Sequence, residues 1–286
     1  MAALLVSTEW LAQNLSDPKI RIVDTRWYLL DNEKTGRGEY ERGHIPGAAF
    51  MNVDGDLAAP FGQGPGRHPL PSPERFAEGA SRAGIGPDTY VIAYDDMGGA
   101  NAGRLWWLLR YHGHNLVSVL DGGVARWIAE GRPIETKTPS VPRATFVPGP
   151  PHREWVVDQS VVDQWRQDPR ALVLDSRAPE RYEGKTEPID PKAGHIPGAK
   201  SAWFVGNVRT DEDWLFRKPQ ELRERFEQLG ADKAERIACY CGSGVNACEN
   251  IFALSLAGFD HVYLYEGSWS DWSRTPNRPV AIGPEP

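Results

Sequence analysis

Cysteine is scarce in this sequence: only Cys239, Cys241 and Cys248 occur among 286 residues. An odd number of cysteines in one short stretch does not make a disulfide framework, so a reducing compartment, the cytoplasm, is expected. The spacing of the three thiols is also wrong for a zinc site, because no histidine lies nearby in the sequence and no second cysteine cluster exists. We therefore expect neither a metal nor a cofactor.

Long apolar runs are also missing. No segment approaches the roughly 18 apolar residues of a membrane span, and the first ten residues lack the cationic start of a secretory signal. Ser7 is instead the expected cap of a first helix. A net charge of −7 argues against nucleic-acid or membrane-surface partners. An apolar content of 40% is ordinary for a globular protein, and a local cationic pocket for a small anion stays open.

Internal repetition is the strongest organising signal in the chain. The block Ile-Val-Asp-Thr-Arg at residues 22–26 is echoed by Val-Leu-Asp-Ser-Arg at residues 173–177. Gly-His-Ile-Pro-Gly-Ala occurs at residues 43–48 and again at residues 194–199. Two blocks repeated at the same displacement indicate a duplicated domain.

The duplication and one proline-rich stretch set the predicted boundaries. We expect a first domain at residues 1–134, a linker at residues 135–151 and a second domain at residues 152–286. The linker region carries several prolines and little apolar periodicity, which is typical of an extended connection.

Short apolar runs alternate with amphipathic stretches in both copies. This alternation predicts an α/β fold with a mainly parallel sheet covered by helices. In such sheets, ligands bind at the carboxyl ends of the strands. The expected strands are residues 21–25, 90–94 and 116–120 in the first copy and 171–175, 236–240 and 262–265 in the second; the expected helices are residues 72–83, 101–111, 124–130, 218–229 and 246–257.

Cys241 directly follows one expected strand and opens the loop Cys-Gly-Ser-Gly-Val, which precedes a helix starting at Asn246. The glycines allow backbone N–H groups to turn toward the sulfur, and the helix start adds partial positive charge. Both favour a thiolate, the nucleophilic form of cysteine. We therefore expect Cys241 to be a covalent catalyst. Asp95 takes the same position in the first copy, so that copy is expected to be inert.

These features together resemble the rhodanese-type sulfurtransferases. The resemblance rests on the paired Gly-His-Ile-Pro-Gly-Ala blocks, the cysteine loop and a Gly-x-x-x-x-Trp segment near the end of each copy, and it covers nearly the whole chain. It implies two tandem rhodanese-like domains, each with a mostly parallel five-stranded sheet covered by helices. The first domain would be the catalytically inactive copy and the second would carry the catalytic cysteine.

The neutral filling of the loop is similar to that of 3-mercaptopyruvate sulfurtransferases, whereas thiosulfate-preferring relatives usually carry basic residues after the cysteine. The resemblance implies that a sulfane sulfur moves from 3-mercaptopyruvate, a small anionic donor, to a persulfide on Cys241. It then passes to a thiophilic acceptor, which could be cyanide, a thiol or a reduced thioredoxin-like protein. Neutral residues also suit this donor physically, because a thiosulfate dianion gains more from cations.

The same resemblance implies a relay of three side chains beside the cysteine. Ser243 is the serine two residues after the nucleophile. His68, in Gly-Arg-His-Pro-Leu-Pro, matches the family's histidine segment in the first domain. Asp54, in Asn-Val-Asp, matches the aspartate that follows the first Gly-His-Ile-Pro-Gly-Ala block. Such a relay could move a proton to the departing pyruvate enolate or from the thiol.

Substrate binding is assigned on the same basis. Arg181 matches the family's anion-binding arginine, and a guanidinium suits a carboxylate. The expected substrate-binding set also includes the loop residues Gly242, Gly244, Val245 and Asn246.

Two departures from the family pattern bear on the donor. The family's second arginine is missing from residues 186–194, and Lys185 or Lys192 is the only nearby replacement. Asn246 stands where relatives usually have threonine, and we expect its side chain to cap the following helix.

Several prominent residues are expected to be structural. Arg177 should pair with a carboxylate near its strand end. His44 and His195 occur at the same place in both copies, including the inert one, so they are expected to support the fold. Cys239 and Cys248 are expected to be buried structural thiols.

A reactive cysteine has three alternative uses. A thiosulfate-preferring sulfurtransferase stays open, and so does a persulfide carrier that does not turn over. A Cys-x5-Arg phosphatase needs an arginine six residues after the cysteine to hold phosphate. Ala247 stands at that position, which argues against phosphatase chemistry.

Overall fold

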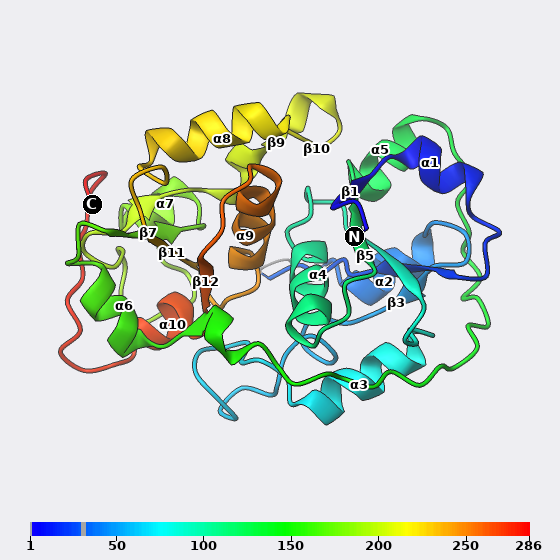
Figure 1. The fold of residues 1–286 in the computed structure, drawn as a ribbon, viewed down its shortest axis with the longest axis horizontal. Helices are drawn as coiled ribbons and strands as arrows, with labels where there is room; N and C mark the ends of the chain where they lie inside the picture. Colours follow the sequence, from blue (N-terminus) through cyan, green and yellow to red (C-terminus); the bar gives the residue numbers. More distant parts are fainter. Residues whose placement is uncertain (1, 30–32) are drawn as a thin grey trace. The chain divides into compact units, whose positions relative to one another are not determined.

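The structure is a computed structural model that describes residues 2–29 and 33–286. Residue 1, at which the first predicted domain begins, lies outside the described residues. The chain forms two compact units (Figure 1). The first contains Met1–Ala59, Pro71–His152 and Val208–Phe216; the second contains Pro60–Leu70, Arg153–Asn207 and Arg217–Pro286. Each unit thus includes a short segment from the opposite half of the sequence.

The first unit alternates strands and helices. Its elements are β1 (Leu5–Val6), α1 (Thr8–Gln13), β2 (Ile20–Asp24), α2 (Gly36–Arg42), β3 (Ala49–Phe50), α3 (Pro73–Arg82), β4 (Tyr90–Tyr94), α4 (Ala102–Tyr111), β5 (Val117–Leu120) and α5 (Gly123–Ala129), with the small hairpin β9 (Val208–Arg209) and β10 (Leu215–Phe216) around a 3-10 turn (Thr210–Glu212). Five of these strands form a sheet in the order β1-β5-β4-β2-β3, and the strand pairs that the structure describes in it are parallel.

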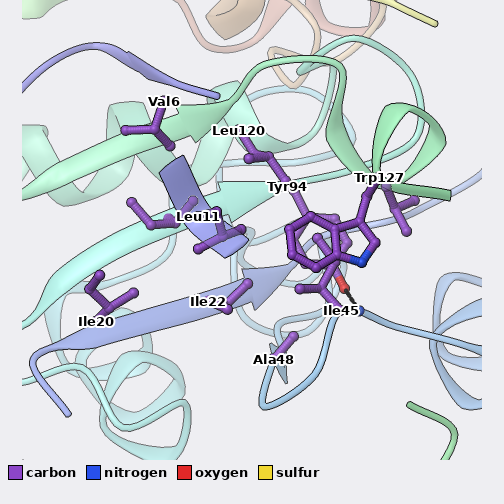
Figure 2. Close-up of a cluster of buried hydrophobic side chains, with 11 residues drawn as sticks. Val6, Leu11, Ile20, Ile22, Ile45, Ala48, Tyr94, Leu120 and Trp127 are labelled. Atoms are coloured by element: carbon purple, nitrogen blue, oxygen red, sulfur yellow. Dashed lines mark hydrogen bonds between the residues drawn. The ribbon is translucent and has the colours of Figure 1, made fainter. Parts of the chain in front are cut away.

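One apolar core cluster of the first unit lies between this sheet and helices α1 and α5. Apolar side chains from alternate strand positions pack against Leu11 and Trp127 and leave almost no exposed surface (Figure 2). The hydroxyl of Tyr94 accepts a hydrogen bond from the backbone N–H of Ile45 at 3.2 Å, so the polar end of this buried ring is satisfied. Ser7 caps α1 as predicted, accepting a hydrogen bond from Trp10 N.

The second unit repeats the pattern. Its elements are a 3-10 turn (Arg153–Trp155), β6 (Val156–Val157), α6 (Gln159–Trp165), β7 (Ala171–Asp175), α7 (Pro179–Tyr182), β8 (Lys200–Ser201), a second 3-10 turn (Phe204–Asn207), α8 (Pro219–Gln228), β11 (Arg236–Tyr240), α9 (Ala247–Leu256), β12 (Val262–Tyr265) and α10 (Ser268–Trp272). The sheet order is β6-β12-β11-β7-β8, again parallel in the described pairs.

The predicted fold class, with two mostly parallel five-stranded sheets covered by helices, is confirmed. In the second unit, α6 and α10 cover one face of the sheet and α8 and α9 lie on the other (Figure 1). Tyr240 pairs in register with Asp175, so β11 and β7 end at the same edge. None of the helices within residues 2–29 and 33–286 combines the length and apolar character needed to cross a membrane.

Candidate active site

Cys241 follows the last residue of β11, between the neighbouring strands β7 and β12. Its backbone N–H donates to Ser268 Oγ at 3.1 Å, and its carbonyl accepts from the N–H of Trp269 at 2.9 Å. The next carbonyl, that of Gly242, accepts from the N–H of Ser270 at 2.9 Å. The segment after β12 therefore holds the backbone on both sides of the thiol.

The loop turns its backbone N–H groups toward the sulfur, as predicted. The N–H of Ser243 donates to Cys241 Sγ at 3.4 Å and that of Gly244 at 3.1 Å. Gly244 has φ +83°, and a Cβ there would lie 2.6 Å from the carbonyl oxygen of Glu266. Only glycine fits this position without strain. The two donors stabilise negative charge on a buried sulfur.

The first copy holds a carboxylate in the equivalent loop. Asp95 Oδ1 accepts from the N–H groups of Met97 at 2.8 Å and Gly99 at 2.9 Å. Asp95 Oδ2 accepts from Asn101 at 2.7 Å and Ala102 at 2.9 Å. Four backbone donors therefore converge on one buried anion. The loop shape shared by both copies is an anion cradle, and only the second copy offers a thiol in it.

Replacing Asp95 with asparagine is expected to lower the free energy of unfolding by about 2 kcal/mol, because an NH₂ group would then face backbone donors in a buried loop. Urea unfolding followed by tryptophan fluorescence would measure it. Asp88→Asn, at an exposed position, is the matched control and should change the free energy by less than about 0.5 kcal/mol. Equal stability of the two variants would contradict the role given to the Asp95 carboxylate.

The predicted pair His68 and Ser243 is brought together. His68 Nδ1 and Ser243 Oγ are 2.6 Å apart and hydrogen bonded, and both side chains are buried. Ser243 also supplies one of the N–H groups on Cys241 Sγ. The imidazole is thus connected to the sulfur loop through a single residue.

The segment carrying His68, Pro60–Leu70, belongs to the second compact unit, although the predicted boundaries assign it to the first domain. Two backbone contacts tie it to the segment after β12. The N–H of Arg67 donates to Ser270 Oγ at 3.0 Å, and that of Leu70 donates to Glu266 Oε2 at 3.1 Å. The same short segment therefore positions both Cys241 and His68.

Asp54 lies in the first unit, after β3. Its Oδ2 accepts a hydrogen bond from Trp27 Nε1 at 2.8 Å. Its predicted place as the third member of the relay stays a prediction.

Arg177 has the expected structural role. Its Nε and Nη2 donate hydrogen bonds to the Asp175 carboxylate, with Nη2 at 2.6 Å from Oδ2. Nη2 also donates to the carbonyl of Gly194 at 2.6 Å. Arg26 makes the same ion pair with Asp24 in the first copy. The attraction of Asp175 raises the pKa of Arg177 despite the desolvation that burial imposes. A contact present in both copies, including the one that holds Asp95 in place of the thiol, supports the fold.

The paired histidines are structural as well. His195 Nδ1 hydrogen bonds to the carbonyl of Tyr182 at 2.8 Å, and the two rings stack at 3.8 Å. His44 repeats both contacts with Tyr40. Burial lowers the pKa of His195, which keeps the imidazole neutral near pH 7.

Arg181 lies beside the cysteine loop, and its expected role in binding the substrate anion stays a prediction. Its Nη2 pairs with Glu187 Oε1 at 2.7 Å and with Asp190 Oδ2 at 3.5 Å. Its Nη1 is 3.4 Å from the position that a Cβ would take on Gly242. The acids come from the stretch in which the family's second arginine is missing, so this stretch orients Arg181 instead of adding a cation.

Arg67 also reaches this place and was missed as a site residue. Its Nη1 donates to Asp190 Oδ1 at 2.5 Å, across 123 positions of sequence. Lys185, one of the two lysines near the missing arginine, instead pairs with Glu183 and leaves 67% of its side chain exposed. Lys192 uses its carbonyl to accept from Trp269 Nε1. The one available signal was that Arg67 directly precedes the predicted His68.

The expected capping role of Asn246 is wrong. Asn246 has φ −67° and ψ −17°, and its side chain makes no capping hydrogen bond to α9. A capping residue needs an extended backbone to reach the next free N–H groups, and Asn246 is already helical. Val245, next to it in the loop, is buried.

The other two thiols are buried and free. Cys239 lies inside β11, where desolvation raises the pKa of its thiol well above the ordinary value. Cys248 Sγ donates to the carbonyl of Gly244 at 3.4 Å on the first turn of α9. The burial of both thiols agrees with their expected structural role.

The rhodanese-like domain family matches residues 7–130 and 158–275. A Pseudomonas aeruginosa protein named as a probable 3-mercaptopyruvate sulfurtransferase is 42% identical, over 99% of each chain. The thiosulfate sulfurtransferase of Rattus norvegicus is 36% identical, over 94% of this chain and 92% of its own. The crystal structure of SseA from Escherichia coli, titled as a 3-mercaptopyruvate sulfotransferase, superposes with a TM-score of 0.81 at 32% identity, covering 94% of this chain and all of SseA.

Proposed function

The chain belongs to the rhodanese-like family and is a sulfurtransferase, and from this premise we propose that Cys241 carries the transferred sulfur as a persulfide, with 3-mercaptopyruvate as the donor. The observation that carries this proposal is the pair of contacts that Ser243 makes: its Oγ is hydrogen bonded to His68 Nδ1, and its backbone N–H donates to Cys241 Sγ. It puts a proton-transferring group within one residue of a nucleophilic sulfur.

In the first half-reaction, the Cys241 thiolate attacks the sulfur of 3-mercaptopyruvate. An S–S bond forms, the C–S bond breaks, and its electron pair leaves on carbon as the enolate of pyruvate. The proton of the donor thiol passes by way of His68 and Ser243 to that carbon, so the products are pyruvate and a deprotonated persulfide. Atoms, charge and electrons balance without an oxidant.

In the second half-reaction, a nucleophilic acceptor attacks the outer sulfur, the S–S bond breaks, and the thiolate of Cys241 returns. Cyanide would leave as thiocyanate and a thiolate as its persulfide; a reduced thioredoxin-like protein would take the sulfur in the same way. The persulfide is an anion. In the first copy, a loop of the same shape directs four backbone N–H groups at the carboxylate of Asp95, which supports anion binding by this kind of loop.

Steady-state rates with 3-mercaptopyruvate and with thiosulfate test the donor. We expect kcat/KM to be at least about tenfold higher for 3-mercaptopyruvate, because thiosulfate carries a second negative charge that the neutral residues 242–244 do not match. Each rate is measured with cyanide and with a thiol acceptor. A clear preference for thiosulfate would overturn the assignment of the donor.

Thiosulfate remains the second candidate donor for one reason. The guanidinium groups of Arg67 and Arg181 lie beside Gly242, and they would also attract a dianion. Mass spectrometry after incubation with each donor distinguishes a sulfurtransferase, whichever donor it prefers, from a persulfide carrier. A persulfide on Cys241 that persists after the acceptor is added would favour a non-turnover carrier.

A further inference from the structure

Arg67 lies beside the Cys241 loop with much of its guanidinium unused. Nη1 donates to Asp190. Nη2 and Nε are buried, and among residues 2–29 and 33–286 neither has a hydrogen-bond partner. Buried donors without an acceptor are rare in native structures and need an explanation. A ligand that brings an acceptor is one such explanation.

The unused Nη2 is the atom of Arg67 that approaches the active loop. It lies 2.9 Å from the position that a Cβ would take on Gly242, and Nη1 of Arg181 lies 3.4 Å from the same position. Arg181 holds Glu187 with its other nitrogens, Nε and Nη2. Both arginines thus turn a nitrogen that the acids leave open toward the residue between Cys241 and Ser243.

The charges around the two arginines favour an anion. Asp190, whose side chain is fully buried, forms ion pairs with Arg67, Arg181 and Arg274. Arg181 and Arg177 both pair with Glu187, and Arg177 also pairs with Asp175. The connected set therefore has four guanidinium groups, those of Arg67, Arg177, Arg181 and Arg274, and three carboxylates. The acids fix the arginines in place without neutralising them. One further negative charge would complete the set.

We propose that Arg67 and Arg181 bind the carboxylate of the sulfur donor together, with Arg67 supplying the second guanidinium. The inference rests on the proposed function for the identity of the donor. Two guanidinium groups that approach from different segments can each donate to one carboxylate oxygen, which fixes both the position and the rotation of the ligand. Gly242 is required between them, because a side chain there would fill the ligand's place.

Arg67→Gln tests this proposal, with Arg274→Gln as the matched control. Both variants remove one positive charge from Asp190, but Arg274 is not among the nearest atoms at Gly242. For Arg67→Gln we expect KM for 3-mercaptopyruvate to rise about 10- to 100-fold, with kcat changed less than about threefold. For Arg274→Gln both constants should change less than about threefold. The KM of Arg67→Lys should lie between those of the wild type and Arg67→Gln, because lysine keeps the positive charge but lacks the two parallel N–H donors of a guanidinium.

Pyruvate binding, measured by calorimetry, adds a readout that does not depend on turnover. Arg67→Gln should weaken it by the same factor as it raises KM. If the wild-type protein used neither donor, the proposed function would fail while this titration still tested Arg67. If the wild type is active and Arg67→Gln leaves KM and pyruvate affinity unchanged, the pairing is wrong. An equal effect of Arg274→Gln would also overturn it, because general charge would then explain the result.

Discussion

Cys241→Ser is expected to abolish sulfur transfer from both donors, lowering kcat by about 10⁴-fold or more. A serine oxygen fits the same loop and can accept from the N–H groups of Ser243 and Gly244. It cannot form a persulfide, however, because no S–S bond can be made to it. The measurement is release of pyruvate from 3-mercaptopyruvate, or of sulfite from thiosulfate, with excess acceptor.

Cys248→Ser is the matched control for this variant. Cys248 donates to the carbonyl of Gly244, and a serine hydroxyl can make the same hydrogen bond, so kcat should stay within about threefold of the wild type. Thermal unfolding of both variants would show that the fold is intact. Turnover by Cys241→Ser above background would rule out the covalent mechanism.

The second large effect concerns Ser243 and His68. Ser243→Ala is expected to lower kcat with 3-mercaptopyruvate by about 10²- to 10³-fold, because the leaving enolate needs a proton and the path to the imidazole is cut. With thiosulfate the leaving group is sulfite, which needs no proton to depart. Its kcat should therefore fall less than about fivefold. Parallel rate measurements with the two donors test this difference.

His68→Ala and the double variant Ser243→Ala/His68→Ala complete the test. The two side chains are hydrogen bonded at 2.6 Å. If they act as one proton path, the double variant should lose no more activity than the worse single variant. Losses that multiply, or losses equal for both donors, would point to positioning of the loop instead of proton transfer.

Much of the frame was predictable because it depends on local patterns. The predicted strand at residues 236–240 is β11, and the predicted helix at residues 246–257 differs from α9 (Ala247–Leu256) by one residue at each end. Apolar runs of fixed length and a following glycine determine such bounds. The turn of Gly244 toward the sulfur follows from glycine's access to positive φ.

The remainder depends on contacts distant in sequence. Arg67 is positioned by hydrogen bonds to Asp190 and Ser270, which are 123 and 203 positions away in the sequence. No local sequence pattern predicts either contact. The cap expected of Asn246 was wrong for the opposite reason. Its residue type favours a cap, but the loop closing on Cys241 already gives it helical dihedral angles. At Asn246, tertiary geometry overrides local propensity.

The exchange of segments between the two units has a consequence for how this protein could have diverged after its duplication. The half of the sequence that carries Cys241 does not contain His68 or Arg67, which come from the other half within Pro60–Leu70. In return, Val208–Phe216 from the later half completes the first unit. Neither half is any longer a self-contained module. Recombination that separated the two halves would therefore part the Cys241 loop from the segment that carries His68 and Arg67.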